Sequence, residues 1–381
     1  MAIKPKIHKN IFWAGILLAQ FILFFLLSKT GAAVRAFEAF FERQKSVHQK
    51  IFSEFGFSAG DVFYLLLIVV IVYLLWNIIR KKNRKKFLTA LLILLNVFYF
   101  LYQLFWGMLY FQNPLIEKLP STEPTLDFAK ETAIRYLQLC KEDRAQLKED
   151  RNGVFKVWDR SAIESEILQN QNRLPGQISD KTGSGVHSFK PALWNRAMSY
   201  TGISGYYNPF TAEAQYNQYL PSTSIPFTLA HESAHQMGFA REQEASFIAY
   251  LIGKDSENKE LRYSTRYYAL RSLLHAIQET DPAFVENILQ QYSEGMRRDR
   301  LYERNFAVRH SGLADAFFAV TNDLFLKSNQ QEGSITYSYF VDLMLRYEAQ
   351  KKNRVSQHDS KNTNDEKKFI AFVARTLSKA S

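Results

Sequence analysis

The sequence predicts a mainly α-helical protein, in which three N-terminal membrane-spanning helices precede a predominantly helical α+β domain. Three observations support this fold class. Three long apolar runs lie within the first 111 residues. Apolar residues recur at three- and four-residue steps through much of the remaining chain. A short aromatic stretch with alternating residues, upstream of residue 226, predicts a small β element.

The three apolar runs, residues 11–28, 62–79 and 87–111, contain no Asp, Glu, Lys or Arg. Each is long enough to cross roughly 30 Å of hydrocarbon as a helix. Buried helices of a soluble core are the alternative, but charged hinges between the runs favour membrane spans. The first run could also be a cleaved signal peptide, because the small residues 31–33 follow it; its length favours an uncleaved span.

The charge of the chain is concentrated beside these runs. The whole chain has a net charge of +11, and residues 1–111 hold 14 Lys/Arg against 4 Asp/Glu, a net charge of +10. The rest of the chain is nearly balanced. The excess therefore indicates membrane topology and argues against a nucleic-acid-binding face.

Basic residues also predict the orientation in the membrane. Six of the seven residues 80–86 are Lys or Arg, and Lys4, Lys6 and Lys9 precede the first run. Such residues stay in the cytoplasm, which places the loop of residues 29–61 and everything after about residue 112 outside. We expect a multi-pass membrane protein with a cytoplasmic N-terminus and an extracytoplasmic C-terminal domain.

The expected domain covers residues 112–350, and a polar tail with a short C-terminal helix covers residues 351–381. Within the domain the pattern predicts helices over residues 126–147 and 161–169, a loop over 176–190, short extended pieces over 202–217, and further helices from Pro226 onward. Cys140 is the only cysteine, so an intramolecular disulfide is excluded.

The residues that carry chemistry are His231, Glu232 and His235, in the pattern H-E-x-x-H. Histidines four residues apart on a helix project from one face and can bind one metal ion. Glu232 lies beside them, where its carboxylate can take a proton from a zinc-activated water. Ser224 is a plausible N-cap for this helix, and Gly238 a natural end, because glycine accepts a positive φ.

A catalytic zinc ion needs a third protein ligand, and two glutamates follow the motif. Glu242 and Glu244 differ by about 200° in direction on a helix, so both cannot bind one ion. We favour Glu242, because Ser246 shares its face and could hydrogen-bond a ligand. Glu244 would then face solvent or pair with Arg241. The alternatives are that Glu244 is the third ligand or that the protein supplies no third ligand.

This arrangement resembles the gluzincin group of zinc metallopeptidases, in which H-E-x-x-H is followed by E-x-x-A-[D/N/S]. The resemblance implies a zincin-like domain with His231, His235 and Glu242 as zinc ligands and Glu232 as general base. Ser246 departs from the usual Asp or Asn at its position. The whole layout, with three spans, the segment Tyr110 to Pro114 where the chain leaves the third span, and the metal helix, also resembles a bacterial family typical of Bacteroidetes, domain of unknown function 3810. This resemblance implies a protein of a bacterial inner membrane whose C-terminal domain is periplasmic or otherwise extracytoplasmic.

Two further roles are expected of a zinc peptidase. Substrate backbone usually pairs with a strand beside the metal helix, and residues 212–219 are the local candidate because they alternate. The developing oxyanion needs a hydrogen-bond donor, for which Tyr337, Tyr339 and Arg241 are candidates.

The sequence thus predicts a membrane-anchored zinc metallopeptidase that hydrolyses peptide bonds of proteins or peptides in the cell envelope. Its expected cofactor is Zn²⁺, and its expected partners are a peptide or protein substrate and the lipid bilayer, with no nucleic acid. The alternative is a membrane sensor or assembly protein whose metal site is structural or vestigial.

Overall fold

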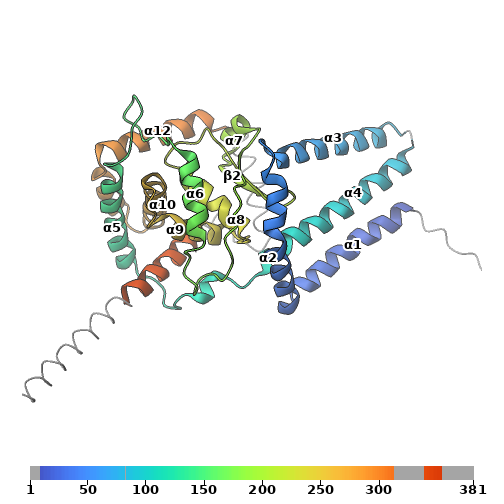
Figure 1. The fold of residues 1–381 in the computed structure, drawn as a ribbon, viewed down its shortest axis with the longest axis horizontal. Coiled ribbons are helices and arrows are strands. Elements are labelled where there is room, and N and C mark those ends of the chain that lie inside the picture. Colours follow the sequence, from blue (N-terminus) through green and yellow to red (C-terminus); the bar gives the residue numbers. More distant parts are fainter. Residues whose placement is uncertain (1–8, 82, 313–338, 354–381) are drawn as a thin grey trace, which may run out of the picture.

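The fold was obtained as a computed structural model, which describes residues 9–81, 83–312 and 339–353. Three of its helices are long and apolar enough to cross a membrane. They are α1 (Lys9–Ser28), α3 (Ala59–Ile79) and α4 (Arg84–Phe105), and they match the three apolar runs. In Figure 1 they extend to one side of the molecule, and the α3–α4 hinge lies at the end far from the domain.

The segment between the first two spans differs from the prediction. It was expected to be a loop, but residues Gly31–Ser53 form the helix α2. One face of this helix, which includes Phe41, Lys45 and Gln49, is buried. Figure 1 shows α2 between the spans and the domain, running across the spans.

The chain leaves the third span through two short 3₁₀ helices. The span ends at Phe105, earlier than the predicted residue 111, because η1 (Gly107–Phe111) follows it in a tighter helical form. Next comes η2 (Leu115–Lys118). The domain helices are α5 (Leu126–Arg144), α6 (Arg160–Gln171), α7 (Asn195–Thr201), α8 (Ile225–Gln236), α9 (Glu242–Gly253), α10 (Lys259–Ile277), α11 (Pro282–Gln290) and α12 (Glu294–His310), and residues 339–353 are also helical.

The predicted β element is a sheet of three short strands. They are β1 (Phe189–Pro191), β2 (Gly205–Asn208) and β3 (Glu213–Tyr216), in the order β1-β3-β2. β3 is parallel to β1 and antiparallel to β2. One side of α8 packs on this sheet and the other side on α9 and α10, so α8 lies in the main hydrophobic core.

Polar contacts tie the sheet to the start of α3. The Glu213 carboxylate accepts hydrogen bonds from the backbone N–H groups of Ala59, at 3.1 Å, and Gly60, at 2.6 Å. Free N–H groups at a helix N-terminus favour such an anion. Buried Asp61 accepts hydrogen bonds from the Leu193 N–H at 2.7 Å, the Trp194 Nε1–H at 2.9 Å and the Tyr206 hydroxyl. The span and the domain are therefore joined by hydrogen bonds to two buried carboxylates.

Candidate metal centre

The metal helix α8 begins and ends with residues suited to those positions. Pro226 lies in its first turn, where its missing N–H costs nothing. Ser224 lies at the N-cap position, as predicted, but its side chain makes no capping hydrogen bond. The Phe227 N–H instead donates to Ser264 Oγ of α10 at 3.1 Å. After the helix, Gly238 has φ +94°, as its predicted role requires. This turn directs the chain back so that α9 runs beside α8.

His231, His235 and Glu242 meet at one point. Glu242 Oε2 lies 3.1 Å from His231 Nε2, and Glu242 Oε1 lies 3.6 Å from His235 Nε2. One ligand atom from each residue lies within 4.8 Å of the others. Ligands about 2.0–2.1 Å from a tetrahedral zinc ion lie about 3.3–3.4 Å apart. The donor types and spacings therefore fit a zinc ion after small side-chain adjustments.

Hydrogen bonds orient both imidazoles so that their Nε2 atoms face Glu242. His235 Nδ1 lies 2.6 Å from the Phe239 carbonyl oxygen, which can only accept, so Nδ1 carries the proton and Nε2 is available as a ligand. His231 Nδ1 lies 3.1 Å from Ser246 Oγ. This is the contact for which Ser246 was singled out.

Glu242 and Glu244 point to different places. Glu244 is buried and accepts hydrogen bonds from the Leu115 N–H at 2.8 Å and from Arg241 Nη1 at 3.1 Å. Its carboxylate thus joins the α8–α9 turn to the chain that leaves the third span. The Glu242 side chain, which is 37% exposed, faces the two histidines. Of the two glutamates, the metal group includes only Glu242.

Glu232 is buried beside the metal group. Its Oε2 atom has no hydrogen-bond partner among the described residues. A Cβ atom added at Gly205 of β2 would lie 2.6 Å from Glu232 Oε1, so the strand leaves room for this carboxylate only because residue 205 is glycine. Buried carboxylate oxygens without partners are costly, and they are tolerated mainly where function requires them.

The buried charges at the site influence one another. Burial raises the pKa of Glu232 to about 8, an effect that His235 opposes and Glu242 strengthens. Burial alone would lower the pKa of His235, but the Glu242 carboxylate outweighs it and raises this pKa to about 9. Burial lowers the pKa of His231. Glu232 therefore has a proton affinity suited to exchange near neutral pH.

Aromatic residues after the third span lie against the site, and the sequence alone did not point to them. The Trp106 ring meets the His235 ring edge to face at 5.6 Å. Trp106 Nε1 donates to the Tyr110 hydroxyl at 3.2 Å, and both residues belong to a cluster with Tyr207 and Ala240. The only sequence feature that pointed to this region was the segment Tyr110 to Pro114, where the chain leaves the third apolar run.

The candidate oxyanion donors lie in different surroundings. Arg241 Nη1 donates to Glu244, and its Nη2 donates to the Gln112 carbonyl at 2.8 Å, so this guanidinium holds the turn in place. Tyr339 packs against the main hydrophobic core. Tyr337 lies outside the described residues.

The strand proposed for substrate binding is the wrong one. Residues 212–219 contain β3, which has β1 on one side and β2 on the other, so both of its edges are occupied. Among the described strands, β2 lies at the edge nearest Glu232. Alternation along the sequence does not distinguish a central strand from an edge strand.

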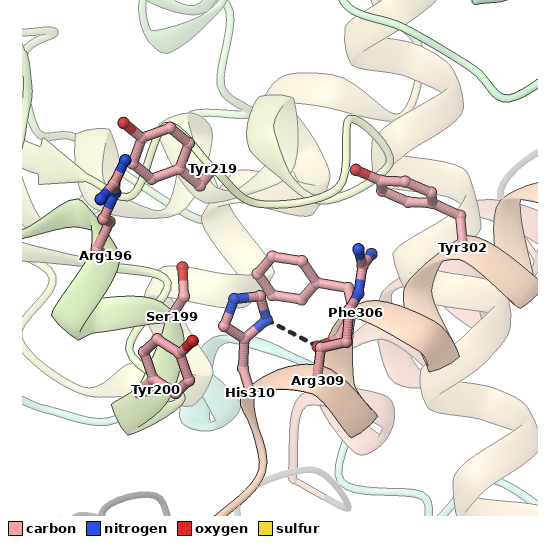
Figure 2. A pocket seen from close by; sticks show the side chains of 8 residues that line it. All are labelled: Arg196, Ser199, Tyr200, Tyr219, Tyr302, Phe306, Arg309 and His310. Carbon is pink, nitrogen blue, oxygen red and sulfur yellow. Dashed lines mark hydrogen bonds between the residues drawn. The ribbon is translucent and has the colours of Figure 1, made fainter.

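Two hollows lie beyond the start of β2, between α7 and α12. Figure 2 shows the first, of about 410 Å³, where Tyr200 and Tyr219 face Tyr302 and His310. The second, of about 500 Å³, shares Ser199, Phe306 and His310 with it and extends to Ser204 and to Ser224 at the start of α8. Neither hollow is lined by the candidate site residues His231, Glu232, His235 and Glu242.

Comparison with known proteins gives one match. The family described as "Protein of unknown function (DUF3810)" matches residues 37–345, which include α8 and α9. Neither the curated proteins nor the solved structures gave a match. Because the family match covers most of the chain, the protein belongs to the DUF3810 family.

Proposed function

We propose that this protein is a membrane-anchored zinc metallopeptidase. The observation that carries the proposal is the convergence of His231, His235 and Glu242, with the buried carboxylate of Glu232 beside them. A purely structural metal site has no need for a second carboxylate, one of whose oxygens lacks a hydrogen-bond partner among the described residues. A hydrolytic site needs such a group to accept a proton.

The proposed roles follow from the contacts. His231 and His235 would hold zinc through Nε2, and Glu242 through its carboxylate. Zinc bound there supplies a water of lowered pKa and polarises a peptide carbonyl. Glu232 takes a proton at its free Oε2 oxygen and passes it to the departing amine, so it serves first as a base and then as an acid.

The edge strand β2 is the best-placed element to align a substrate. An extended peptide can pair with an open strand edge through backbone hydrogen bonds. A peptide aligned on β2 would pass Glu232 near Gly205 and continue toward the hollow at Ser204. The substrate class we propose is therefore a polypeptide in extended conformation, from proteins or peptides of the cell envelope.

The proposed location is the inner membrane of a bacterium, with the domain on the extracytoplasmic side. The basic sequence of residues 80–86 supports this orientation, because the ends of α3 and α4 that it connects lie far from the domain (Figure 1).

The test uses the full chain in nanodiscs and compares wild type with Glu232→Gln. We expect both to bind one zinc ion, and the variant to cleave casein or envelope peptides about 100- to 10,000-fold more slowly, the usual contribution of a general base. Glu286→Gln, an exposed glutamate on α11, is the matched control and should cleave like wild type. Equal cleavage by wild type and Glu232→Gln would overturn the proposal.

The alternative, a membrane sensor or assembly protein with a structural metal site, has one observation in its favour. The His235 ring contacts Trp106, the residue directly after the third span, so metal binding at His235 could change the position of that span. Under this alternative, Glu232→Gln should keep full biological activity, and neither protein should cleave peptides.

A further inference from the structure

The helix α2 has three distinct faces, and the first of them fixes its position on the domain. Phe41, Lys45 and Gln49 are essentially fully buried. Lys45 Nζ donates to the Thr182 carbonyl at 2.7 Å, and Gln49 Nε2 donates to the carbonyl of Gln236, the last residue of α8, at 3.2 Å. The orientation of α2 is thus set by buried contacts with the domain.

The second face of α2 is apolar and exposed. Phe40, Val47 and Ile51 recur at seven- and four-residue steps, so they form one stripe, and they are 38%, 64% and 57% exposed. Beyond the end of the helix, Phe55 and Phe57 are 42% and 47% exposed. Contiguous exposed apolar residues of this kind mark sites of contact with a partner or a membrane.

The third face of α2 is basic. Arg35, Arg43 and Lys50 are exposed on the other flank of the apolar stripe. A helix with an apolar stripe bordered by basic residues is typical of helices that lie flat in a membrane interface.

The position of α2 agrees with such an environment. The Phe40 ring stacks on Phe105, the last residue of the third span, at 6.3 Å, and the His48 ring lies 5.1 Å from the same ring. Figure 1 shows α2 running across the spans, as a helix in the membrane plane would. The apolar stripe therefore begins at the depth where α4 ends.

The β2–β3 turn reaches into the same region. The Phe210 ring stacks on Phe98 of α4 at 4.7 Å and lies 5.2 Å from Phe63 of α3. Phe98 precedes Phe105 by seven residues, about 10 Å along the helix. The His48 ring Nε2, on α2, lies 2.9 Å from the Phe210 carbonyl oxygen. The domain thus extends into the span bundle at this turn.

From these contacts we propose that α2 lies in the plane of the membrane and binds the lipids of one leaflet. The stripe of Phe40, Val47, Ile51, Phe55 and Phe57 contacts acyl chains, and the basic flank contacts lipid phosphates. Lipid is the occupant because Phe40 of the stripe stacks on Phe105 at the end of α4, and the three apolar helices that could cross a membrane carry many exposed apolar side chains.

One consequence, which rests on the proposed function, concerns the substrate. The His235 ring lies 5.6 Å from Trp106, one residue past the end of α4, so the metal group lies at the level of the lipid headgroups. Peptide bonds held close to the membrane surface would reach it most readily.

Single cysteines labelled with an environment-sensitive fluorophore test the lipid contact without any measurement of hydrolysis. Cys140 is fully buried, so the unmodified chain serves as the labelling blank. The variants are Val47→Cys and Ile51→Cys on the apolar stripe and Ser46→Cys on the basic flank, in the full chain in vesicles of phosphatidylcholine and phosphatidylglycerol. Tyr73→Cys, on the exposed surface of α3, is the positive control.

Doxyl groups on the lipid acyl chains should quench the label at positions 47, 51 and 73 at least twofold more than at position 46. Both stripe positions are well exposed, so neither substitution should disturb folding, and unchanged thermal unfolding checks this. Equal and weak quenching of the labels at positions 46, 47 and 51 would show that the stripe faces water, and it would overturn the proposal. Blue-shifted emission without quenching would show that a second protein copy covers the stripe, which also contradicts it.

Discussion

Glu242 and Glu244 lie two residues apart, and their surroundings assign them different roles. Glu242 faces both imidazoles, whereas Glu244 is held by Arg241 and the Leu115 N–H. This division follows from helix geometry, in which two residues along α9 turn the side chain by about 200°. The direction could be predicted from the sequence; the partner at Leu115 could not, because it comes from a distant segment.

Substitution of the two glutamates should have very different effects on zinc affinity. Glu242→Gln should weaken zinc binding by more than about 100-fold, since loss of an outer hydrogen bond to a ligand already costs about 10- to 100-fold. Glu244→Gln should keep zinc affinity within a few-fold but lower the thermal stability, because it leaves the partly buried Arg241 without its charge partner. Competition with a chromogenic chelator measures both affinities. Stronger loss for Glu244→Gln than for Glu242→Gln would refute the assignment.

At the scale of elements, Gly205 of β2 and Glu232 of α8 depend on each other. A Cβ atom at position 205 would lie 2.6 Å from the carboxylate and 2.8 Å from the Gln215 carbonyl oxygen. Neither element can move freely, because β2 is paired with β3 and α8 is buried in the main core.

We therefore expect Gly205→Ala to displace Glu232 while leaving the zinc ligands in place. Peptide cleavage should fall by at least tenfold with one zinc ion still bound. Gly185→Ala provides a matched control for general effects of glycine replacement, since a Cβ atom there meets no atom within 4 Å, although its φ of +61° will cost some stability. Full activity in Gly205→Ala would mean that Glu232 is not the proton acceptor.

The elements differ in how well the sequence predicts them. The spans and α8 could be predicted because a long apolar run, or a motif framed by Pro226 and Gly238, needs no distant partner to be recognised. The helix α2 was missed because its charges suggest a loop. The burial of Lys45 can be understood only from its hydrogen bond to Thr182, which belongs to the distant domain. The edge position of β2 likewise depends on strand order, which local alternation does not encode.

At the scale of the whole molecule, the metal group lies where the membrane spans join the domain. Trp106 contacts His235, Glu244 accepts a hydrogen bond from the Leu115 N–H, and Glu213 caps the first turn of α3. The sequence predicts three spans and a helical domain as successive parts of the chain. It does not reveal that both parts build one site, because those contacts join residues more than 100 positions apart.

The most direct test of the account is the zinc content of the purified full chain, measured by atomic emission for wild type and for His231→Ala with His235→Ala. Samples are dialysed with a weak chelator to remove loosely held metal. The account predicts one zinc ion per chain in wild type and less than about one tenth of that in the double variant. A folded wild-type chain without zinc after reloading, or equal zinc in both proteins, would contradict it.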